Sequence, residues 1–275
     1  MNTLENCVQK LKPKNFSFPV KDILTESFQI WSKILFLGIF SMLFTFSLIS
    51  LGMLLCNNYW NISSIDNEFL IALKNIPLKN TYYNNINSSK EIWNIYYNYF
   101  SNPYIIIRFL ILLVIKILIS PLYSGVIYCA YKYDNFGKAS FNDLISGFEG
   151  KRFLNLIVLN TIYLIIMICS IIFMYIPMIF FAPAFTLAGA FVAIHNISAF
   201  KAIKYSTKIA YINFGKMFFL TFIIFLTGNF LGTLLMSIYA FIFTIPFSLV
   251  IIYIIYKKII GYNFFYKSSA EANEK

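Results

Sequence analysis

The chain contains long apolar stretches that no charged side chain interrupts. Residues 34–55 form one such stretch, residues 153–200 form a second, and residues 217–256 form a third. A membrane-spanning helix needs about 20 apolar residues, because each residue adds about 1.5 Å of rise and the hydrocarbon layer is about 30 Å thick. The first stretch is therefore long enough for one span, and each of the other two is long enough for two.

One more span is needed for the two termini to lie on the same side of the membrane, and residues 109–131 are the best candidate. This stretch is less regular than the others, because Lys116 lies inside it and Pro121 and Gly125 interrupt it. The sequence thus predicts an all-α fold, a polytopic helical membrane bundle of about six transmembrane helices with additional interfacial amphipathic helices. The predicted spans are residues 34–55, 109–131, 153–175, 178–195, 217–235 and 238–256.

Composition and charge support this interpretation and orient the chain. Hydrophobic residues make up 59% of the sequence and charged residues only 12%, whereas a soluble domain has about 25% charged residues. The predicted inner segments, 1–33, 132–152, 201–216 and 257–275, carry 17 of the 22 Lys and Arg residues. The positive-inside rule therefore predicts that both termini lie in the cytoplasm. Most of the net charge of +11, namely +9, then lies on the inner face against anionic lipid and does not indicate a nucleic-acid partner.

The predicted organisation is one membrane domain between two cytoplasmic segments. Residues 1–33 form a cytoplasmic N-terminus with an amphipathic helix, residues 34–256 form the six-span domain, and residues 257–275 form a cytoplasmic tail. Asn and Ile are frequent while Ala is scarce, which is typical of an AT-rich bacterial genome. We therefore expect a multi-pass protein of the bacterial cytoplasmic (inner) membrane.

The outer loop, residues 56–103, is rich in Asn, Tyr and Trp. Tyr and Trp side chains prefer the membrane–water boundary, because one end of each is apolar and the other is polar. We therefore expect short helices near the outer surface, over residues 66–74 and 89–99.

Two charged segments have the periodicity of amphipathic helices. In residues 20–33 the apolar side chains gather on one side at 100° per residue. In residues 198–211, Lys201, Lys204 and Lys208 share one face, opposite apolar positions. Such helices lie in the membrane interface, so this basic face is predicted to meet anionic headgroups of the inner leaflet. The alternative is that these helices only anchor loops at the interface.

Lys116 is the most informative single side chain, because a lysine inside a span costs about 2.5–3.5 kcal/mol on insertion scales. No Asp or Glu lies in any predicted span, so no intramembrane ion pair is available to it. Arg108 precedes Lys116 by eight residues, on nearly the same helix face. One interpretation is a cationic strip that binds a lipid headgroup or another anion. The other is a span that starts deeper, with Lys116 reaching outward to the interface.

The sequence lacks the residue sets that carry catalysis or bind metals. His195 is the only histidine, and it has no acidic or cysteine neighbour with which to build such a site. The four cysteines are scattered and predict no disulfide framework. We therefore expect a protein that is not an enzyme and that needs no metal or other cofactor.

Small residues and prolines suggest how the spans pack. Gly228 and Gly232 have the spacing of a helix-packing motif in the fifth predicted span. Pro121, Pro183 and Pro246 each lie inside a span. Broken helices can line a transport site, but we favour a structural role for these prolines.

A prolyl turn at Pro177, an Ala-Pro pair ending at Pro183 and an Ala-x-x-x-Ser helix core at residues 202–206 follow one another in the chain. This order resembles a motif of bacterial inner-membrane proteins of the YciC type, and a related pattern in the membrane domain of some glycerophosphodiester phosphodiesterases. Two positions depart from the family pattern, because Met178 replaces a glycine and His195 replaces an acidic residue. The resemblance implies a six-span inner-membrane protein, with no catalytic residues to carry over.

These observations favour a non-enzymatic protein that takes part in envelope or lipid homeostasis, with membrane lipids as its partners. A small-solute transporter or permease is one alternative, in which Lys116 would line a midplane site. A membrane anchor for a partner complex is another, and it would use residues 132–152 and 257–275. The sequence indicates neither a protein partner nor an oligomeric state.

Overall fold

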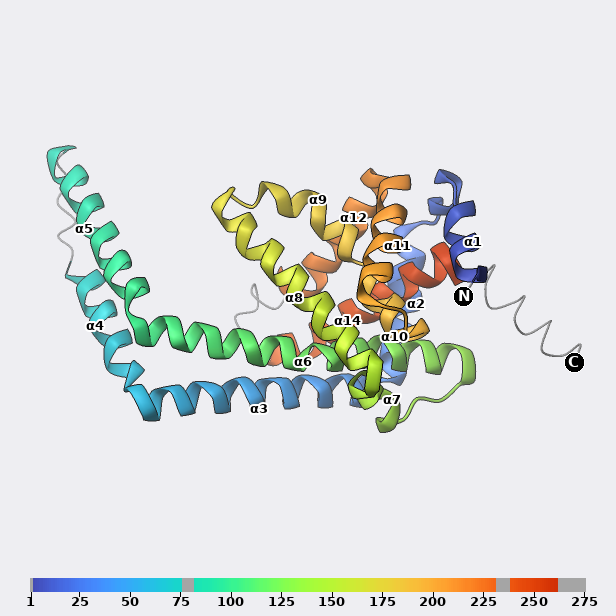
Figure 1. Cartoon of the computed structure of the whole chain (residues 1–275), viewed down its shortest axis with the longest axis horizontal. Helices are drawn as coiled ribbons and strands as arrows, with labels where there is room; N and C mark the ends of the chain where they lie inside the picture. The colour runs from blue at the N-terminus through green and yellow to red at the C-terminus, as the bar shows by residue number, and fades with distance from the viewer. Residues whose placement is uncertain (1, 76–81, 231–237, 262–275) are drawn as a thin grey trace, which may run out of the picture. The chain divides into compact units, whose positions relative to one another are not determined.

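The computed structural model describes residues 2–75, 82–230 and 238–261, and all regular elements within them are helices. The predicted all-α class is therefore confirmed (Figure 1). The chain forms two compact units, one of residues 1–44 with 119–275 and one of residues 45–118. Hydropathy does not indicate this division, because two long helices continue through both of its boundaries.

Five helical segments in the described residues are long and apolar enough to cross a membrane, so the chain is an integral, multi-pass membrane protein. Each corresponds to a predicted span, with bounds that differ by a few residues. The fourth of them is interrupted after Phe185 and resumes at Ala188. The helices are α3 (Leu35–Trp60), α6 (Pro103–Phe136), α8 (Gly150–Ile172), the consecutive α9 (Ile176–Phe185) and α10 (Ala188–His195), and α14 (Ile238–Tyr256).

A sixth crossing would come from a bent pair of helices, α11 (Ala199–Ile212) and α12 (Phe214–Phe225), whose axes differ by 113°. The bend is at Asn213, which has non-helical backbone angles and whose side chain accepts a hydrogen bond from the Lys216 backbone N–H at 3.2 Å. A π-helix, η3 (Leu226–Phe230), continues α12. The predicted fifth span, residues 217–235, lies partly outside the described residues.

In the larger unit, α2 (Val20–Lys33) has the bounds predicted for the amphipathic helix and packs against α14. The Trp31 ring meets those of Phe243 and Phe247 edge-on, at 6.5 and 5.7 Å between centroids. The apolar side of α2 is thus largely covered by protein, although Phe28 remains exposed. The short helices α1 (Asn2–Lys10) and η1 (Pro13–Phe16) precede α2, and the π-helix η4 (Lys257–Gly261) follows α14.

The chain after α6 folds back onto that helix through α7 (Phe141–Ile145) and η2 (Ser146–Phe148). Ser140 and Asp143 form a capping box at the start of α7. The approach depends on glycine. A Cβ on Gly125 of α6 would overlap the Leu144 carbonyl oxygen and lie 2.8 Å from its carbonyl carbon.

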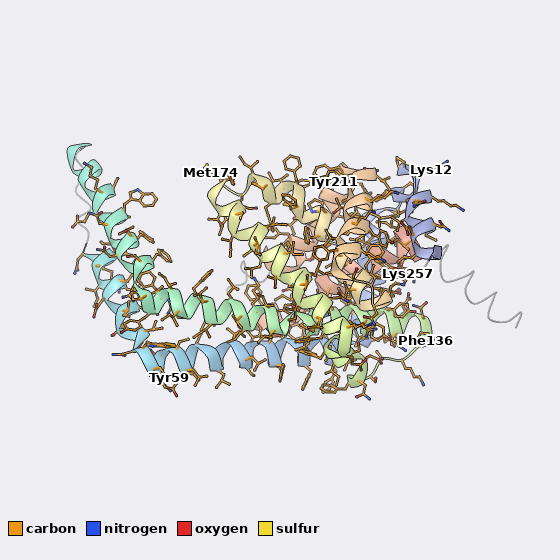
Figure 2. All side chains as sticks on the ribbon, in the orientation of Figure 1. Lys12, Tyr59, Phe136, Met174, Tyr211 and Lys257 are labelled. Carbon is orange, nitrogen blue, oxygen red and sulfur yellow. The ribbon has the colours of Figure 1, made fainter. Side chains whose placement is uncertain are left out.

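The smaller unit holds the end of α3, the start of α6 and two helices between them, α4 (Ile62–Lys74) and α5 (Tyr82–Ser101). These two helices correspond to those predicted over residues 66–74 and 89–99, and both are longer. The buried side chains of Cys56, Ile62 and Ile105 form the core of this unit. Large side chains such as Tyr59 remain on its surface (Figure 2).

Candidate functional site

The basic face of α11 consists of Lys201, Lys204 and Lys208, and the structure brings these three side chains together as predicted from their spacing. All three are exposed, whereas the opposite side of the helix is buried. No acidic residue occurs within α11, and none of the three lysines forms an ion pair with a described residue. Phe200 and Tyr211, near the two ends of the same helix, are also exposed.

Hydrogen bonds from neighbouring helices hold α11 in this orientation. The Leu187 backbone N–H, at the interruption between α9 and α10, donates to the Ser206 hydroxyl at 3.2 Å. The Ala199 backbone N–H donates to the side-chain oxygen of Asn155 on α8 at 3.3 Å. Because Ser206 is fully buried, the lysines on the other side of the helix must point away from the packed helices.

Arg108 forms a closed network with Asp66 and Tyr99 that links α4, α5 and α6. Its guanidinium lies 2.7 Å from the Asp66 carboxylate and donates to the Tyr99 hydroxyl at 2.8 Å, while that hydroxyl donates to Asp66 at 2.5 Å. Burial would raise the pKa of Asp66, but the hydrogen bonds from Arg108 and Tyr99 outweigh it and hold that pKa below its usual value. The sequence could not reveal this pair, because 42 positions separate the two residues.

Lys116 lies on the surface of the same unit, two turns after Arg108, and its side chain is exposed. Arg108 is already engaged by Asp66, so an anion bound there would compete with a carboxylate. The structure does not test whether Arg108 and Lys116 bind a headgroup, and that site stays a prediction.

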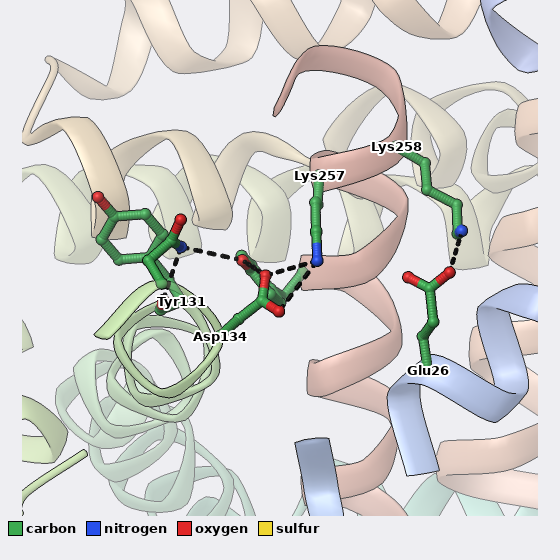
Figure 3. Close-up of polar contacts among 7 residues, drawn as sticks. Glu26, Tyr131, Asp134, Lys257 and Lys258 are labelled. Atoms are coloured by element: carbon green, nitrogen blue, oxygen red, sulfur yellow. Dashed lines mark hydrogen bonds and ion pairs between the residues drawn. The ribbon is translucent and has the colours of Figure 1, made fainter. Parts of the chain in front are cut away.

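A second group of charged contacts joins η4 to α6 and to α2 in the larger unit (Figure 3). The ammonium of Lys257 lies 2.7 Å from the carboxylate of Asp134, which also accepts a hydrogen bond from the Tyr253 hydroxyl at 2.6 Å. Lys258 forms an ion pair with Glu26. Two lysines that the sequence groups with the basic tail are therefore neutralised by carboxylates within the protein.

His195, at the end of α10, shares a hydrogen bond with the Tyr256 hydroxyl and lies near the Phe191 ring. Among the described residues, no group of three or more His, Cys, Asp or Glu side chains could hold a metal ion. These contacts join α10 to α14 and give His195 a packing role.

Gly228 of η3 lies in close contact with α14. It is buried, a Cβ there would lie 2.8 Å from the Ser248 hydroxyl, and its carbonyl accepts a hydrogen bond from Thr244 at 3.0 Å. This is the kind of close approach that the glycine motif predicts. Its second member, Gly232, lies outside the described residues.

No family model, no curated protein and no solved structure matches this chain. The resemblance to YciC-type proteins accordingly stays a prediction.

Proposed function

We propose that this protein is a non-enzymatic component of the bacterial inner membrane that takes part in envelope or lipid homeostasis and binds anionic phospholipids through the basic face of α11. The observation that carries the proposal is the exposure of Lys201, Lys204 and Lys208 on one face, with no carboxylate among the described residues to neutralise them. The exposed rings of Phe200 and Tyr211 fit the same environment, because aromatic side chains favour the membrane interface.

The expected strength of lipid binding follows from the charge of the three lysines. A lysine close to an anionic bilayer surface contributes about 1 kcal/mol, so three of them contribute about 3 kcal/mol. Since about 1.4 kcal/mol corresponds to a factor of ten, the basic face can favour anionic over zwitterionic lipid by up to about a hundredfold. Salt weakens such an interaction, because the Debye length falls to about 3 Å at 1 M.

The test is the lipid composition retained by the purified protein. We would reconstitute the chain in nanodiscs of phosphatidylglycerol and phosphatidylcholine and measure the lipids around it by mass spectrometry. The triple variant K201Q/K204Q/K208Q should lose its enrichment in phosphatidylglycerol. The control K74Q/K90Q removes charge from exposed positions in α4 and α5, on the predicted outer side, and should retain it. Equal enrichment in both variants would refute the proposal.

A small-solute permease is the second candidate, and the interruption of the fourth span supports it. The Thr186 hydroxyl, at that interruption, lies 2.8 Å from the Thr221 hydroxyl of α12, and interrupted helices near the middle of a membrane often line transport sites. Uptake of small solutes into proteoliposomes, abolished by Thr186→Val, would support this function over lipid binding.

A further inference from the structure

We propose a discrete phosphate-binding site, for the headgroup phosphate of a phospholipid, formed by Lys132 of α6 and Arg152 of α8 next to the Tyr128 ring. It uses none of the α11 lysines and does not depend on the function proposed above.

The two cations converge on one aromatic side chain. The Arg152 guanidinium carbon lies 4.9 Å from the centroid of the Tyr128 ring, and the Lys132 ammonium lies 5.7 Å from it. Arg152 is held in place by a hydrogen bond that it donates to the Ser146 carbonyl at 3.2 Å. The sequence places these residues 20 positions apart and on different helices, so only the fold brings them together.

No carboxylate balances this pair of charges within the described residues. The nearby Asp134 is engaged by Lys257 and Tyr253, Asp143 is engaged in the capping box of α7, and neither Lys132 nor Arg152 forms an ion pair with a described residue. The Nε–H of Arg152 is buried and has no hydrogen-bond partner. Two cations without a counter-charge repel one another, so an anion next to them would stabilise this arrangement.

The surroundings favour the phosphate of a lipid. Lys132 lies four residues before the end of α6 and Arg152 is the third residue of α8, so both side chains are within about 6 Å of a helix end. The ends of spanning helices lie at headgroup depth. The Phe136 ring, whose centroid lies 4.9 Å from the Lys132 ammonium, is exposed, which suits the acyl chains of the same molecule.

The experiment measures phospholipid retained after extensive detergent washing, by native mass spectrometry of the intact protein. We expect the wild type to keep bound phosphatidylglycerol. Arg152→Gln should retain at least tenfold less of this lipid than the wild type. Lys132→Gln should weaken retention as well, and this variant breaks no hydrogen bond that holds the fold. Lys138→Gln, at an exposed position between α6 and α7, is the matched control and should retain lipid as the wild type does.

Arg152→Lys separates charge from geometry. The variant keeps the cation but loses the planar fork that contacts Ser146 and a phosphate together, so we expect intermediate retention. Wild-type retention in both Arg152→Gln and Lys132→Gln would overturn the proposal. The variant K201Q/K204Q/K208Q should keep the tightly bound lipid, which separates this site from the basic face of α11.

A titration with inorganic phosphate distinguishes the two sources of the anion. Isothermal calorimetry on the delipidated protein should show phosphatidylglycerol in mixed micelles binding far more tightly than inorganic phosphate. Phosphate that binds the wild type as tightly as the lipid, and fails to bind Arg152→Gln, would show that the site serves a soluble anion and would overturn the lipid assignment.

Discussion

Gly125→Ala tests whether the contact between α6 and α7 is as close as the structure shows. An alanine Cβ would overlap the carbonyl oxygen of Leu144 and lie 2.8 Å from its carbonyl carbon, where ordinary contacts begin at 3.4 Å. The obstacle is backbone, so no side-chain rotation can relieve it. The short segment of α7 and η2 must therefore move away from α6, and it would carry the Ser146 carbonyl that holds Arg152 with it.

The expected loss of stability in Gly125→Ala is the sum of two opposing contributions. Overpacking typically costs about 1–3 kcal/mol, and a backbone obstacle places this substitution at the upper end of that range. Alanine is better than glycine inside a helix by about 1 kcal/mol, which offsets part of the cost. The net loss of about 2 kcal/mol should lower Tm by about 4–8 °C in a protein of this size.

Gly215→Ala is the matched control. Gly215 lies in the first turn of α12, and no atom of the described residues outside that turn lies within 4 Å of the position that its Cβ would take. This substitution should leave Tm unchanged or raise it by a few degrees. Thermal unfolding in detergent, followed by circular dichroism at 222 nm, measures both variants. If the Tm of Gly125→Ala equals that of Gly215→Ala or exceeds that of the wild type, α7 does not lie against α6 as described.

Three further predictions concern other contacts. Because the pKa of Asp66 is lowered, its ion pair with Arg108 stabilises the protein at neutral pH, and this contribution is lost as the pH falls through that pKa. The difference in Tm between wild type and Asp66→Asn should therefore shrink from pH 5 to pH 3. A difference in Tm that stays constant over this range would contradict the prediction. Gly228→Ala should lower Tm through its overlap with Ser248, and Ser248→Gly should suppress that loss in a double-mutant cycle, whereas additive effects would show no contact. Trp31→Ala should cost about 3 kcal/mol, since it removes the ring that packs on α14, and chemical denaturation that detects no loss would rule this packing out.

Features with a local or periodic basis were predictable. A span is a run of apolar residues as long as the membrane is thick, so α3 and α8 could be placed within a few residues. The bounds of α2 follow from its charges and from Pro19 before its first residue. Hydropathy does not separate an apolar face that meets lipid from one that meets protein, so the packing of α2 on α14 could not be anticipated.

Contacts between distant positions left no signal in a single sequence. In the sequence, Asp66 is one of many polar residues of the outer loop, yet in the structure it forms an ion pair with Arg108. The sequence alone suggests grouping Arg108 with Lys116. Asp134 and Lys257 lie 123 positions apart, and both are counted only as charges of the inner segments. A charge count gives the number of cations, whereas their availability depends on which carboxylates the fold brings near them.

The basic residues fall into two groups, according to whether a carboxylate of the protein pairs with them. Arg108, Lys257 and Lys258 have carboxylate partners in the protein, so a change in lipid charge should leave them unaffected. Arg152 and the basic face of α11 have none among the described residues, and their counter-charge must come from the surroundings. The lysines of α11 sit on long exposed stems and suit many mobile headgroups, whereas Arg152 is fixed by Ser146 and Tyr128 and suits one bound phosphate. Replacing phosphatidylglycerol by phosphatidylcholine should therefore lower the stability of the wild type, and it should do so less when Arg152 is glutamine.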